Sequence, residues 1–148
     1  MATFAYNDHT HRLGEGNVAY ATDDHRLFLF MSNTTADTED DITTWGGLTT
    51  PDWYDGTGGD STSGYALDSE AWAKDASNNR SEFDAADEVL SGVAAGTRDC
   101  VGSGLAQWDT DRASSHPEVF LDHTDFAGNG GDVTFQMPAE GIIQVGQA

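Results

Sequence analysis

The longest unbroken run of apolar residues in the chain, residues 27–31, predicts a central β-strand. The run is far shorter than the roughly 20 apolar residues that cross a bilayer. A helix of this length would be marginal in water. Because side chains alternate between the two faces of a strand, and both sets are apolar here, we expect a strand that is covered on both faces.

The cleanest alternation of polar and apolar residues lies near the C-terminus, at residues 132–137. Val133, Phe135 and Met137 would face inward, while the polar residues between them face solvent. The Gly- and Asn-rich segment 127–131 precedes this stretch, and these residue types adopt positive φ at little cost. The pattern therefore predicts a tight turn that leads into a half-buried strand.

Further short strands are expected where apolar residues are bounded by turn signals. These segments are 18–20, 97–101 together with 104–108 across a glycine interruption, 118–122 and 141–145. Residues 65–75 are ambiguous, because they contain good helix formers but their apolar positions fit neither period. About seven or eight short strands favour an all-β single domain, a β-sandwich or jelly roll. We expect residues 1–22 to form a polar N-terminal arm and a first strand, and residues 23–148 to form the sandwich.

Length and composition agree with one loop-rich β domain. A chain of 148 residues can bury a sizeable core. A hydrophobic fraction of 37%, with 17 Gly and 3 Pro, is low for a helical bundle. Cys100 is the single cysteine of the chain, so an intrachain disulfide is excluded and a buried, inert thiol is expected.

Charge is the strongest compositional signal: 26 Asp and Glu face 6 Lys and Arg, for a formal charge of −20. Lys74 is the only lysine. In dilute buffer such a surface repels itself and works against a compact state. At molar salt the Debye length falls to about 3 Å, and most of the repulsion disappears. We therefore expect a salt-rich environment; the alternative is a merely acidic mesophilic protein.

The same charge balance disfavours several classes of partner. Direct nucleic-acid binding needs a cationic patch, and the five Arg residues scattered from Arg12 to Arg112 form no stripe. Residues 1–17 lack the basic start and apolar core of a signal peptide. Insertion into a membrane is not expected either, because no long apolar run occurs.

Catalytic and metal-binding motifs are weak, so we expect no enzyme and no cofactor. The chain contains no Gly-x-Ser-x-Gly elbow, no Walker loop and no His-Glu-x-x-His motif. His9 and His11 would share one face of an extended segment, either as a metal pair or within a solvated arm. A hydrated acidic surface is the default, and one structural Ca²⁺, Mg²⁺ or Na⁺ ion is the alternative. The carboxylates that would supply such an ion are Asp37, Asp40, Asp41, Asp52, Asp55 and Asp60.

Four aromatic residues interrupt polar stretches instead of following a strand pattern: Trp45, Trp53, Tyr54 and Trp72. A protein interface of useful strength needs roughly 1,000 Å² or more with an apolar centre. These four are therefore the candidate interface anchors. The alternative is that they cap the hydrophobic core. Asn33 and Asn79 also begin glycosylation sequons, a pattern that often arises by chance.

Three stretches in order are similar to a family of small virion proteins of tailed phages. They are 24–30 followed by 34–38 (Thr-Thr-Ala-Asp-Thr); 78–87, with its Phe-Asp-Ala turn; and 130–136 together with Gly141-Ile142-Ile143. The chain departs from the family in its polar leader, where members often begin with an apolar helical segment, and in its extreme acidity. The resemblance favours strand over helix at 65–75.

The resemblance implies a capsid decoration (cement) protein on the head surface of a tailed virus, and the extreme acidity indicates a haloarchaeal host. Its partners would be the major capsid protein and copies of itself, in a trimer or other small ring. One alternative is a tail, neck or receptor-facing component built on the same sandwich. A second alternative, from another class, is a carbohydrate-binding or hydrolytic jelly roll with Trp and Asp lining a sugar groove.

Overall fold

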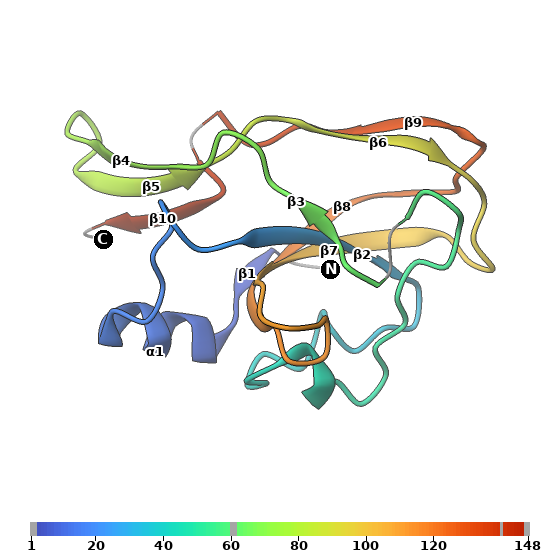
Figure 1. The fold of residues 1–148 in the computed structure, drawn as a ribbon, viewed down its shortest axis with the longest axis horizontal. Coiled ribbons are helices and arrows are strands. Elements are labelled where there is room, and N and C mark those ends of the chain that lie inside the picture. Colours follow the sequence, from blue (N-terminus) through green and yellow to red (C-terminus); the bar gives the residue numbers. More distant parts are fainter. Residues whose placement is uncertain (1–2, 60–61, 140, 147–148) are drawn as a thin grey trace.

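The computed structural model describes residues 3–59, 62–139 and 141–146. Strands dominate these residues; one α-helix, α1 (Asn7–Glu15), and one short 3₁₀ helix, η1 (Trp45–Gly47), accompany them. All strand pairs are antiparallel and form three sheets (Figure 1). The all-β class predicted from the sequence is confirmed, whereas the strand order by itself does not establish a jelly roll or a sandwich topology.

The largest sheet has five strands and runs through the middle of the molecule. Its order is β1 (Phe4–Ala5), β8 (His116–Phe126), β7 (Cys100–Gln107), β2 (His25–Met31) and β3 (Tyr65–Ala66). Strand β2 is an interior strand between β7 and β3 and not the middle one, but residues 27–31 are all buried, as predicted for a strand covered on both faces. Its side chains supply two separate hydrophobic cores, because alternate residues point to opposite faces.

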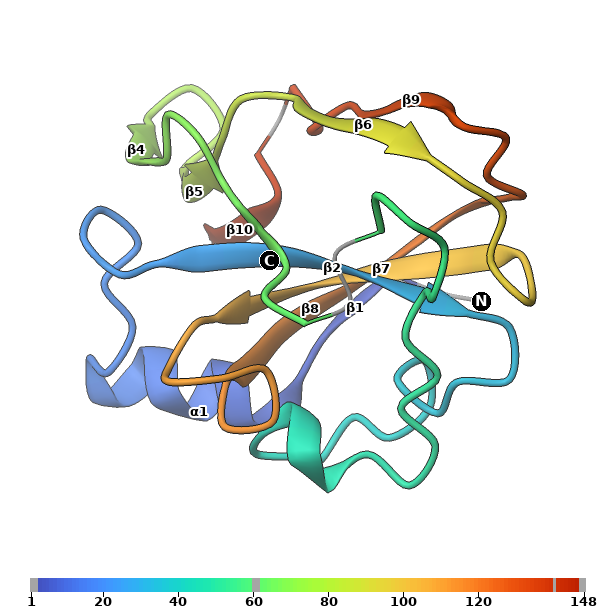
Figure 2. The ribbon, with the colours of Figure 1, turned by 45° about the vertical axis from the view of Figure 1, so that its right-hand side comes forward.

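Two smaller sheets lie over one face of this central sheet (Figure 2). One contains β10 (Ile143–Gly146), β5 (Arg80–Asp84) and β4 (Ala71–Asp75), and the other pairs β6 (Glu88–Val93) with β9 (Gly131–Phe135). The first core lies between these layers. Its fully buried members include Leu27, Leu29, Phe83, Leu90, Val93 and Leu105.

The opposite face of the central sheet is covered by the start of α1 and by long loops instead of a sheet (Figure 2). The second core there includes Tyr6, Phe28, Phe30, Trp45 and Phe120. Glycines in β7 let the aromatic rings approach the sheet closely. A Cβ on Gly102 would lie 2.3 Å from the Phe120 ring, and one on Gly104 would lie 2.9 Å from the Trp45 ring.

The first strand of the N-terminal 22 residues is β1, and the strand expected at residues 18–20 does not form. Residues 7–15 of the polar N-terminal segment form helix α1, which was not predicted. The helix is stabilised by tertiary contacts, because His9 is buried against β8, and Gly16 ends it in the left-handed conformation. The strand predictions for 65–75 and 132–137 are confirmed by β3, β4 and β9.

Candidate functional site

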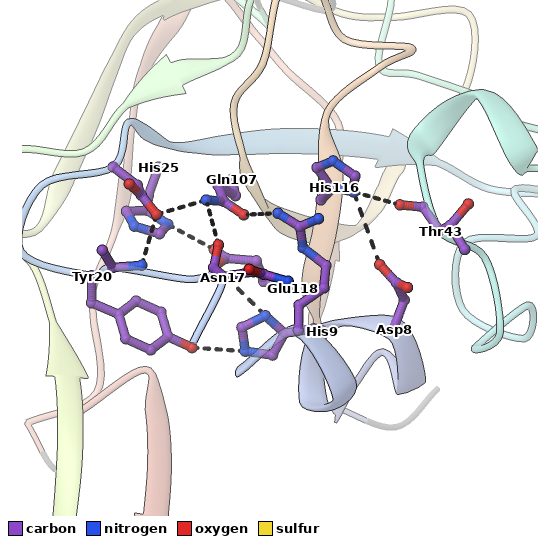
Figure 3. Close-up of polar contacts among 12 residues, drawn as sticks. Asp8, His9, Asn17, Tyr20, His25, Thr43, Gln107, His116 and Glu118 are labelled. Atoms are coloured by element: carbon purple, nitrogen blue, oxygen red, sulfur yellow. Dashed lines mark hydrogen bonds and ion pairs between the residues drawn. The ribbon is translucent and has the colours of Figure 1, made fainter. Parts of the chain in front are cut away.

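A buried polar network connects α1 to the central sheet, with Glu118 of β8 between two histidines (Figure 3). Glu118 Oε2 lies 3.0 Å from His25 Nδ1, and Glu118 Oε1 lies 3.7 Å from His9 Nδ1. The Nε2 atom of His9 is 2.7 Å from the hydroxyl of Tyr20. All four side chains are buried. Glu118 therefore joins β8 to β2 through its hydrogen bond with His25, and it lies beside His9 of α1 at a distance too long for a hydrogen bond.

Glu118 and burial shift the pKa values of the two histidines in opposite directions. Burial by itself lowers the pKa of His25, but the hydrogen bond to Glu118 and the negative charge of Glu118 outweigh burial, so the pKa is raised. For His9 burial is the larger effect, and the pKa is lowered despite the Glu118 charge. Burial also raises the pKa of Tyr20, which keeps its hydroxyl protonated. The geometry places His25 to donate from Nδ1 to Glu118 and His9 to accept the Tyr20 hydrogen bond at Nε2.

A second polar cluster continues this network toward the surface (Figure 3). Arg12 of α1 donates from Nη2 to Gln107 Oε1 over 2.6 Å. Gln107 Nε2 in turn donates to Asp23 Oδ2, at 2.6 Å, and to the carbonyl oxygen of Asn17, at 3.2 Å. These bonds fix the loop between α1 and β2. Because the histidines and Glu118 are shielded from solvent, the arrangement is suited to attaching the helix to the sheet and not to contacting a substrate.

The structure separates the four aromatic interface candidates instead of bringing them to one surface. Trp45 and Tyr54 are fully buried, so in this fold they have no surface to offer a partner. Trp45 packs in the second core, and the Tyr54 hydroxyl donates to the carbonyl of Ala94 over 2.9 Å. Trp53 is half-buried, with the Arg112 guanidinium 4.4 Å from its ring centroid. Trp45 and Tyr54 therefore belong to the hydrophobic cores and are not interface anchors in this fold.

Trp72 is the candidate that reaches the surface, with 38% of its area exposed. It lies on β4, an edge strand of the three-stranded sheet. One face of its ring stacks on Tyr20, with 4.8 Å between the ring centroids. A hollow of about 280 Å³ lies beside it, and its apolar walls include Leu13 and Val18. The ring is therefore fixed in place by the buried network while part of it faces solvent.

Basic and apolar side chains continue this surface along the sheet. Lys74 follows Trp72 by two residues on the same strand, so both point to the same face. Val145, which lies across Ser81 from Lys74 in the register, is 45% exposed. Arg80 is already held by Asp75 and Glu82, at 3.4 and 3.2 Å. We call the set Leu13, Val18, Trp72, Lys74 and Val145 the β4 surface.

Two of the carboxylates considered as alternative ion ligands have partners within the protein. Asp52 pairs with Arg98 at 2.9 Å, and Asp55 accepts bonds from the Thr97 amide and hydroxyl. Asp60 lies outside the described residues. Within ranges 3–59, 62–139 and 141–146, no three His, Cys, Asp or Glu side chains are grouped to hold a metal.

His9 and His11 do not share one face, because the segment is helical and not extended. Residues two apart in a helix point away from each other, so His9 is buried and His11 is exposed. Cys100 is buried as predicted, and burial raises the pKa of its thiol to about 12. A thiol with this pKa is a poor nucleophile at neutral pH.

Comparisons with known proteins identify no relative: the chain matches no protein-family model, no curated protein and no solved structure. In the described part of the chain, no helix combines the length and the apolar character needed to span a bilayer.

Proposed function

We propose that this chain is a structural virion protein, a capsid decoration (cement) protein of a tailed virus with a haloarchaeal host. It would bind at the head surface, next to the major capsid protein and other copies of itself, and would catalyse no reaction. The sequence stretches similar to small phage virion proteins support the class. The all-β body, with a hydrophobic core on each side of its central sheet, suits a rigid building block.

One observation carries the proposal: the exposed edge strand β4 presents Trp72 beside the only lysine of a strongly acidic chain. An edge strand offers unpaired backbone N–H and C=O groups to another chain. Tryptophan is enriched among the residues that dominate binding energy at interfaces. The partner that we propose for the β4 surface is a second copy of this chain, because the many carboxylates of that copy can pair with the positive charge of Lys74.

The stacking of Trp72 on Tyr20 strengthens this argument. A surface anchor loses less side-chain entropy on binding when its rotamer is already fixed. Tyr20 is held by His9 at 2.7 Å and packs on Phe83 with 4.5 Å between the ring centroids. The anchor is therefore supported from α1 and β5 at once, and the buried network acquires a role in preparing the β4 surface.

Charge determines the conditions in which this assembly would form. Two copies that each carry a formal charge of −20 repel one another in dilute buffer. At molar salt the range of that repulsion is about 3 Å, so short-range contacts at the β4 surface can hold the copies together. A salt-rich environment and self-association through β4 therefore support each other. The acidic exterior would keep whole particles dispersed.

The test is the oligomeric state measured by analytical ultracentrifugation in millimolar and in molar KCl. We expect a trimer or other small ring in molar KCl that dissociates as salt is removed. Trp72→Ser and Lys74→Glu should shift the molar-KCl sample toward monomer. Val89→Ser is the matched control, since Val89 is 52% exposed on β6, away from β4. A monomer at every salt concentration, or equal effects of the three substitutions, would contradict the proposal.

A further inference from the structure

A second hollow, unrelated to the β4 surface, lies between the central sheet and the segment that follows β9. Its volume is about 230 Å³. Leu27 of β2 and Leu121 of β8 line it from the sheet, and Met137 and Ile142 line it from the opposite layer. Asp122, His123 and Gln136 add polar groups to the lining. The hollow is thus mainly apolar and belongs to the first core.

The lining also contains one buried hydroxyl that has no partner. Ser103 of β7 is fully buried, and its Oγ makes no hydrogen bond to any described residue. Its cross-strand neighbours are Leu29 and Leu121, whose side chains have no hydrogen-bonding group. Buried polar groups are nearly always paired, so an unpaired one calls for a partner from outside the chain.

Another fully buried serine, Ser115, provides the comparison. Ser115 Oγ donates to the Asp111 carbonyl over 2.7 Å and accepts from the Asp109 amide over 3.1 Å. Ser115 is thus satisfied within a turn, as buried hydroxyls usually are. Ser103 differs because it lines the hollow and its hydroxyl has no hydrogen-bond partner in the described part of the chain.

We propose that this hollow binds a small uncharged organic molecule with an apolar body and one hydroxyl or carbonyl group, which hydrogen-bonds to Ser103. An engineered apolar cavity of about 150 Å³ can bind benzene, so this larger one accommodates a substituted ring. The apolar walls disfavour a charged group, and neither lysine nor arginine lines the hollow to neutralise an anion. This proposal stands independently of the proposed virion role.

The test compares p-cresol with toluene, two probes that differ by one hydroxyl. Each is titrated into the ¹⁵N-labelled full chain in molar KCl and followed by amide chemical shifts. We expect both probes to shift the amides of residues 27, 103, 121 and 137. We also expect Ser103→Ala to lower the ratio of p-cresol to toluene affinity by about tenfold, the effect of roughly one hydrogen bond. Ser115→Ala should leave that ratio unchanged.

Each other outcome would overturn the proposal. If neither probe shifts these amides, the hollow holds no organic ligand. If Ser103→Ala leaves the affinity ratio unchanged, Ser103 does not anchor the hydroxyl. If the shifts appear around Trp72 instead, the probes bind the β4 surface. Ser103→Ala removes only an unpaired atom, so the variant is expected to fold, and its unperturbed amide spectrum serves as the check.

Discussion

Replacing Glu118 by glutamine is the sharpest perturbation of the buried network. The change keeps the shape of the side chain but removes the negative charge that lies 3.0 Å from His25 Nδ1. Breaking a buried ion pair by removing one partner typically costs about 3–5 kcal/mol. When the remaining group can lose its charge, the loss falls toward that of an unmade buried hydrogen bond, about 1–3 kcal/mol.

The expected loss therefore depends on pH, and the direction of the pKa shift gives the sign. In the folded wild type the pKa of His25 is raised above its ordinary value. The stability that its proton provides is present in full below the unfolded pKa, about 6.5, and is lost as pH rises through the folded pKa. Glu118→Gln removes this contribution. The variant should thus lose more stability near about pH 6 than near about pH 8.5.

The assay is urea denaturation in molar KCl, followed by tryptophan fluorescence at both pH values. Glu15→Gln is the control, because Glu15 pairs with the exposed His11 at the end of α1 and should change stability by less than about 0.5 kcal/mol. A loss below about 1 kcal/mol at both pH values would refute the reasoning, since it lies under the cost of a buried hydrogen bond. An equal loss at both pH values would refute the assignment of the proton to His25.

Three further predictions concern packing, buried hydroxyls and salt. Gly102→Ala should destabilise the fold by more than about 2 kcal/mol in urea denaturation, because the added Cβ would lie 2.3 Å from the Phe120 ring. Gly14→Ala is the control: Gly14 lies in open space on α1, and its replacement should stabilise the fold by about 0.5–1 kcal/mol. A more stable Gly102→Ala variant than Gly14→Ala variant would contradict the packing. In the same assay, Ser115→Ala should lower the free energy of unfolding by about 1–3 kcal/mol, because it removes a paired buried hydroxyl, whereas Ser103→Ala should lower it by less than about 0.5 kcal/mol. Similar losses for the two variants would mean that both hydroxyls are paired. The melting temperature should rise with KCl up to molar concentrations, and a maximum near zero salt would remove the argument for a salt-rich environment.

The strands could be predicted because their signals are local. The apolar run at 27–31 gives β2, the glycine-interrupted stretch beyond it gives β7, and the alternation at 132–137 gives β9. In each case the period of the side chains and the neighbouring turn residues agree. Helix α1 could not be predicted in this way, because Asn, His, Thr and Gly are poor helix formers. It is held by residues far away in the sequence: Arg12 donates to Gln107 over 2.6 Å, and His9 is buried beside Glu118.

The site was only partly predictable for a related reason. Aromatic residues in polar loops are consistent with an interface or with a core, and the choice depends on what covers the sheet. Here loops cover one face, so Trp45 points inward, whereas Trp72 lies on β4, the edge strand of its sheet among the described residues. The polar network was missed because His25 and Glu118 are 93 residues apart, and no local pattern links them.

Quantitative mass spectrometry of purified particles of the virus that encodes this chain tests the central proposal most directly. A decoration protein should be present in a copy number that scales with the major capsid protein, and it should remain with the heads when the tails are removed. A copy number matching a single tail ring would assign the chain to the tail. Its absence from the particles would contradict a virion role altogether.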